Sequence, residues 1–170
     1  MSSRPLDRIL DANFNRAREG LRVCEELCRF VLDAPGLTRR LKTLRHRLAD
    51  ELRSGAFDPA RLARARDSRS EVGRGYDRLE SKRDGLRSVF IANIERVKES
   101  LRVLEEISKT VDGRAPARFK SMRFTAYAIE KTALRQLEAL CDHDDTGRAG
   151  HRGARPLGRQ RRSRRRATAR

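Results

Sequence analysis

Residues 12–26 read ANFNRAREGLRVCEE, and residues 92–106 read ANIERVKESLRVLEE. Nine of these fifteen positions are identical, at an offset of 80 residues. The segments that follow also match, because RLKTLR at 40–45 parallels RFKSMR at 118–123 at an offset of 78 residues. The chain therefore contains one unit of two helices twice, and two such units can bury their apolar stripes against each other as an antiparallel bundle.

Apolar residues recur at alternating spacings of four and three residues in both halves, which is the spacing of one helix face. The first series is Leu10, Phe14, Ala17, Leu21, Cys24, Cys28 and Val31, and the second is Phe90, Ile94, Val97, Leu101, Leu104 and Val111, with Ser108 as its only polar member. The pattern, with the Pro and Gly positions, predicts helices over about 7–32, 37–53, 60–65, 86–111 and 116–140. No segment alternates as a strand does. We therefore expect an all-α fold, an antiparallel helical bundle built from two repeated helical hairpins joined by a short helix and a long loop.

Composition divides the chain of 170 residues into a helical bundle domain, 1–141, and a basic disordered tail, 142–170. The net charge is +17, and ten arginines without an acid in residues 146–170 leave +7 for residues 1–145. The tail predicts non-specific contact with nucleic acid, or a C-terminal extension without function. Absence of an 18-residue apolar run, of a secretory signal and of an even cysteine set predicts a cytoplasmic protein with no membrane span.

Polar residues outside the apolar series also recur in both halves: Asn13, Arg16, Glu19 and Arg22 match Asn93, Arg96, Glu99 and Arg102. One interpretation is a set of ion pairs along each helix, such as Glu19–Arg22 and Arg22–Glu26. The other is a ligand pocket, since asparagine is a poor helix former and its use twice in mid-helix needs a cause.

The strings RILDANFNRAREGLRVCEELCRF, LKTLRHRL, ARDSRSEVG and GLRSVFIANIERVKESLRVLEEISK together resemble one family. It is the hydroxymethylpyrimidine-phosphate kinase family, a helical domain fused N-terminally to some bacterial thiamin-phosphate synthases and also found alone. The resemblance covers about residues 4–140. It implies ATP-dependent phosphorylation of 4-amino-5-hydroxymethyl-2-methylpyrimidine phosphate to the diphosphate, with ATP and Mg²⁺ as cofactors. The chain departs from the family at Glu71, where aspartate is expected.

Within this resemblance, the loop from Arg66 to Gly75 is the preferred site. Arg66, Asp67 and Glu71 are the candidate catalytic residues, and Asp67 and Glu71 would hold Mg²⁺. Gly73 would let the backbone approach a phosphate. The helix-borne phosphate-binding candidates are Asn13, Arg16, Arg22, Asn93, Arg96 and Arg102. The chain has no P-loop and no protein-kinase motif, so kinase activity is implied by the resemblance alone. A solvated, arginine-rich loop without a ligand is the alternative.

Two further functions compete with the kinase. One is a non-catalytic helical module that binds a pyrimidine phosphate or docks on thiamin-phosphate synthase. The other is a nucleic-acid-binding protein that acts through its arginine-rich tail. Cys24 and Cys28 lie one helical turn apart on the apolar face, where buried core thiols are far more common than metal ligands.

Overall fold

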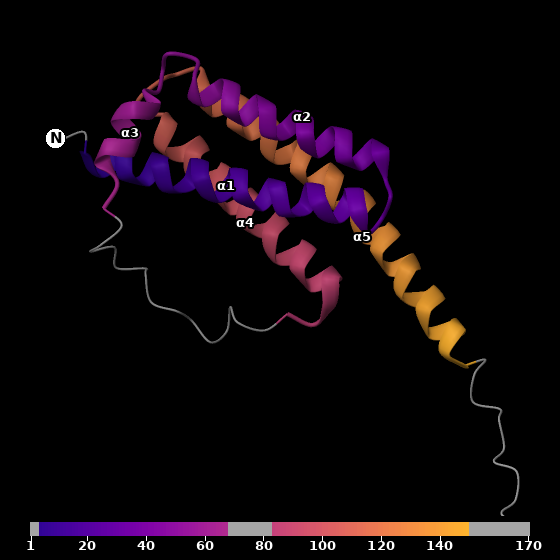
Figure 1. The fold of residues 1–170 in the computed structure, drawn as a ribbon. Coiled ribbons are helices and arrows are strands. Elements are labelled where there is room, and N and C mark those ends of the chain that lie inside the picture. The colour runs from indigo at the N-terminus through magenta and orange to yellow at the C-terminus, as the bar shows by residue number, and fades with distance from the viewer. Residues whose placement is uncertain (1–3, 68–82, 150–170) are drawn as a thin grey trace, which may run out of the picture.

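Five helices make up residues 4–67 and 83–149, which are the part of the chain that the computed structural model describes (Figure 1). They are α1 (Arg4–Phe30), α2 (Pro35–Leu52), α3 (Pro59–Ala65), α4 (Gly85–Ser108) and α5 (Ala115–Ala149). These residues contain no strand. The prediction of an all-α bundle with a short third helix is therefore confirmed.

The four long helices close a ring around the core. α1 packs against α2 and α4, while α5 packs against α4 and α2, and α3 lies on α1. α1 and α2 form the first repeated hairpin and α4 and α5 the second, so the ring joins two copies of one unit (Figure 1). No helix among the described residues is long and apolar enough to cross a membrane.

The predicted apolar faces of α1 and α4 form the centre of the core. Every member of both series from Leu10 to Cys28 and from Phe90 to Leu104 is buried. Ser108 is also fully buried, because its hydroxyl donates to the carbonyl oxygen of Glu105 at 3.2 Å. The last members of the two series, Val31 and Val111, depart from the prediction, since α1 and α4 end before them and Val111 is 39% exposed.

Local signals set most of the helix ends. The Asp58 side chain accepts a hydrogen bond from the Ala60 amide at 2.9 Å, and Pro59 occupies the first turn of α3, as Asp58-Pro59 predicted. α5 is the exception, because it continues to Ala149, past Leu140, where the change in composition predicted its end. That change reports the loss of burial, whereas a helix ladder can continue through polar residues that include no proline. Residues 150–170 of the predicted tail lie outside the described residues.

α1 and α4 approach most closely at Gly20. A Cβ atom placed at Gly20 would lie 2.8 Å from the carbonyl oxygen of Asn93 and 2.9 Å from Cγ2 of Val97. Both distances are shorter than a side chain tolerates, and the first involves backbone, which cannot rotate away. The two repeated helices can therefore pack at this separation only because position 20 carries no side chain.

Gly20→Ala is expected to destabilise the bundle. Overpacking of a tight site costs about 1–3 kcal/mol, which outweighs the gain of about 1 kcal/mol that alanine brings to a helix interior. The control is Gly36→Ala in the first turn of α2, where an added Cβ meets nothing within 4 Å. Urea denaturation should show a lower free energy of unfolding for Gly20→Ala only; equal values for the two variants would contradict the close approach.

Candidate functional site

A cleft of about 740 Å³ lies along α1 and the two residues that follow α3. Its size is that of a pocket for a small molecule. Four arginines and three carboxylates line it, together with two asparagines and three apolar residues: Arg8, Arg16, Arg18, Arg66, Asp11, Glu19, Asp67, Asn13, Asn15, Pro5, Ile9 and Ala12. The cleft thus unites four of the predicted site residues, namely Asn13, Arg16, Arg66 and Asp67.

Arg66 enters the cleft from the end of α3 and is bound to Asp11. Its Nε donates to Oδ2 of Asp11 and its Nη2 donates to Oδ1, both at 2.7 Å. The hydrogen bonds with Asp11 raise the pKa of the Arg66 guanidinium above its ordinary value. Two of the five N–H donors of Arg66 are used in this way, which leaves three for another ligand. Arg66 is therefore first of all a tie between α3 and α1.

Asp11 is the site residue that the sequence reasoning missed. Its side chain is only 12% exposed, although it belongs to the polar part of the repeated segment. Asp7, one turn earlier, is buried as well and pairs with Arg61 of α3 at 3.2 Å. Two carboxylates four residues apart at the start of a helix, followed later by two arginines five residues apart, were the available signal.

Arg16 is the exposed cation of the cleft, whereas Asn13 is largely buried. The amide of Asn13 donates to the carbonyl oxygen of Ile9 at 2.8 Å, and the amide of Asn93 donates to that of Val89 at the same distance. Both asparagines thus bond to their own helix, one turn back. This arrangement supplies a structural cause for the mid-helix asparagines and leaves the binding role of each a prediction.

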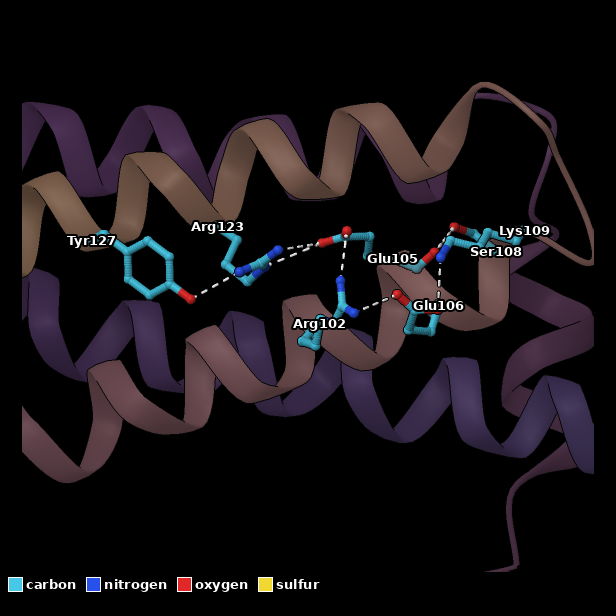
Figure 2. A network of polar contacts seen from close by, with 7 residues as sticks. All are labelled: Arg102, Glu105, Glu106, Ser108, Lys109, Arg123 and Tyr127. Carbon is cyan, nitrogen blue, oxygen red and sulfur yellow. Dashed lines mark hydrogen bonds and ion pairs between the residues drawn. The ribbon is translucent and has the colours of Figure 1, made fainter.

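Arg22 and Arg102 lie outside the cleft, in two equivalent ion-pair networks. Arg102 contacts Glu105 at 2.8 Å and Glu106 at 2.9 Å (Figure 2). In the first half, Arg22 contacts Glu25 and Glu26, as the ion-pair interpretation predicted for Glu26. The recurrence of these arginines is accounted for by pairing within each helix.

Each network continues into the neighbouring helix through a buried glutamate. Arg45 of α2 donates to Glu25 at 2.9 Å, and Arg123 of α5 donates to Glu105 at 2.8 Å. Figure 2 shows Arg123 reaching from α5 to Glu105 of α4, with its other side turned to the hydroxyl of Tyr127 at 2.9 Å. The matching offsets of 80 and 78 residues in the sequence are therefore the trace of one conserved helix-to-helix tie.

Three of the predicted site residues are not placed at the cleft or are not described. Asn93 and Arg96 belong to α4 and do not line it. Glu71 and Gly73 lie outside the described residues. Their roles stay predictions, and so does the Mg²⁺ site, because Glu71 was one of its two ligands. Among the described residues, no group of three potential metal ligands occurs.

Cys24 and Cys28 are core thiols, as predicted. Both are fully buried, and the thiol of Cys24 lies 3.8 Å from the carbonyl oxygen of Phe90. Burial raises the pKa of the Cys28 thiol to about 11 and that of Cys24 further still. Thiols held neutral in this way do not act as nucleophiles.

The fold and the cleft define a helical bundle with an arginine-lined site for a small anion, and comparison with known proteins assigns its family. The model of the ThiD2 family matches residues 8–132. The chain belongs to the ThiD2 family.

Several curated relatives share this region. A thiamine-phosphate synthase from Rhodopirellula baltica is 44% identical over 137 residues, which are 80% of this chain and 35% of the relative. A thiamine-phosphate synthase from a Synechocystis species is 43% identical over 132 residues, which are 75% of this chain and 36% of the relative. The matched region thus spans about a third of these relatives. No solved structure matches the chain.

These relatives correct one expectation. The resemblance implied a hydroxymethylpyrimidine-phosphate kinase that works by itself, whereas the relatives at 41–44% identity are named thiamine-phosphate synthase, which is a transferase. The assignment as a kinase is therefore wrong. Its weakness was physical, because arginines and carboxylates around a phosphate serve binding as well as transfer, and the chain carries no nucleotide motif. The place in thiamin biosynthesis is confirmed.

Replacement of Arg66 should lower stability as well as alter the cleft. Arg66→Met leaves the nearly buried Asp11 carboxylate without its bidentate partner, which should cost about 1–2 kcal/mol, less than for a fully buried pair because Arg66 is half exposed. Arg64→Met is the control, since Arg64 is 71% exposed and lies 3.8 Å from Asp58. Thermal unfolding followed by circular dichroism should separate the two; equal midpoints would show that the Arg66–Asp11 pair contributes nothing to stability.

Proposed function

We propose that this chain is a helical module of thiamin biosynthesis that binds a phosphorylated pyrimidine in the cleft along α1. The observation that carries the proposal is the gathering of four arginines in one small cleft. Guanidinium groups bind phosphate through paired, charge-assisted hydrogen bonds. The ligand we expect is 4-amino-5-hydroxymethyl-2-methylpyrimidine phosphate, in accord with the thiamin-phosphate name of the relatives.

The balance of charge in the cleft favours a ligand with one phosphate. Asp11 already compensates Arg66, so three arginines face two remaining carboxylates, those of Glu19 and Asp67. The surplus is a single positive charge, which suits a phosphate monoester better than a polyphosphate chain. Arg16 is the most suitable anchor, because it is exposed and no carboxylate lies one turn away from it at positions 12, 13 or 20.

Arg16→Ala should weaken binding of the pyrimidine phosphate by about tenfold or more, since a hydrogen bond to a charged group contributes about 1.5–3 kcal/mol. Isothermal titration calorimetry measures the dissociation constant. The matched control is Arg39→Ala, which removes an exposed arginine of α2 that does not line the cleft. The unphosphorylated pyrimidine should bind equally to all three proteins. An unchanged dissociation constant in Arg16→Ala would exclude this cleft as the phosphate site.

The second part of the proposal is association with a thiamine-phosphate synthase. The support is that the relatives carry the matched region and about twice its length of further chain in one protein. Domains that occur fused in one protein often bind each other when they are separate chains. The contact would bring the pyrimidine site close to the enzyme that uses a related compound.

This association can be measured with the Rhodopirellula baltica relative from which the region matching this chain has been removed. Sedimentation velocity of the mixture should show a complex heavier than either component. The intact relative serves as the control, because its own helical region would compete for the same surface and reduce complex formation. Independent sedimentation of both proteins at micromolar concentration would contradict the association.

A further inference from the structure

We propose that Asp11 is the positioning residue of the phosphate site, because it holds Arg66 directly and Arg18 through Asn15 in fixed places around the cleft. This inference rests on the proposed function. It assigns a role to a carboxylate that would otherwise count against anion binding, and it predicts a sign of effect that simple electrostatics does not.

The contact between Asp11 and Arg66 determines the plane of the guanidinium. Two hydrogen bonds of 2.7 Å between the same two groups leave little freedom of rotation. The edge of Arg66 that carries its Nη1 atom is then the part available to a ligand. A long side chain that is half exposed would otherwise lose conformational entropy each time it bound a phosphate.

Asn15 extends the arrangement along α1. Its Nδ2 donates to the backbone oxygen of Asp11 at 3.0 Å and to Oδ1 of the Asp11 carboxylate at 3.3 Å. These two bonds decide which way the amide group points, so its oxygen faces the other side, where Arg18 donates to it at 3.3 Å. One carboxylate thus orients two arginines, and all four residues line the cleft.

The neighbouring pair Asp7–Arg61 shows what a purely structural tie looks like. It joins the same two elements, α1 and α3, one helical turn away, and Asp7 is even less exposed than Asp11. Neither Asp7 nor Arg61 lines the cleft. A role in ligand binding is therefore expected for Asp11 and not for Asp7, although both pairs hold α3 in place.

The test is a double-mutant cycle on the full chain with the pyrimidine phosphate as the titrated ligand. Asp11→Asn keeps the size of the side chain but turns one acceptor into a donor that faces the donors of Arg66. Affinity should fall by about tenfold in Asp11→Asn and by a similar factor in Arg66→Met. The double variant should bind like Arg66→Met within about twofold, because Asp11 acts through Arg66.

The sign of the effect separates positioning from charge. If Asp11 were only a negative charge beside the ligand, its neutralisation would tighten anion binding. Asp7→Asn is the matched control, in which the melting temperature should fall while the dissociation constant stays unchanged. Tighter or unaltered binding in Asp11→Asn, or additive losses in the double variant, would overturn the inference.

The outcomes also distinguish this inference from the proposed function. If the wild-type chain binds the ligand and Arg16→Ala weakens binding, the cleft is the phosphate site whatever Asp11 does. If the wild type does not bind, or if Arg16→Ala binds normally, the proposed function fails and the role of Asp11 in binding fails with it.

Discussion

The bundle depends on the rule that a carboxylate removed from water must meet a cation. Four buried or nearly buried acids obey it, and each partner comes from a different element: Asp11 with Arg66, Glu25 with Arg45, Glu51 with Arg118, and Glu105 with Arg123. These pairs tie α1 to the end of α3, α1 to α2, α2 to α5, and α4 to α5. Loss of one partner strands a charge in the protein, which costs far more than the pair gains. The pairs therefore select one arrangement of the helices, while the apolar core supplies most of the stability.

Duplication explains the scaffold and not the site. The glutamate–arginine tie recurs in both halves, as do the asparagines that bond one turn back. The cleft differs between the halves. At the position equivalent to Arg18, the second half has Lys98, which binds Glu95 of its own helix and Glu130 of α5 at 2.6 and 2.7 Å. The cation that lines an open cleft in one half is thus part of the packing in the other.

Phosphate handling by itself does not define a reaction. Guanidinium groups fixed by carboxylates can retain a substrate, deliver it to a second enzyme or stabilise its transfer, and the side chains required overlap. The relatives place this helical region within proteins named for thiamin-phosphate synthesis, about two thirds of which lies beyond the matched part. The physical role that follows most directly from the cleft is binding with a defined orientation.

The sequence by itself determined the five helices, the two repeated hairpins and the buried face of α1 and α4, because helical periodicity and caps are local properties of the chain. It also identified Arg16, Arg66, Asn13 and Asp67, which the cleft brings together. Only the tertiary structure decided that Arg66 pairs with Asp11, 55 residues away, and that Arg22 and Arg102 pair within their helices. It alone decided the close approach at Gly20. Such contacts depend on the angle and separation of packed helices, and no local pattern of residues encodes them.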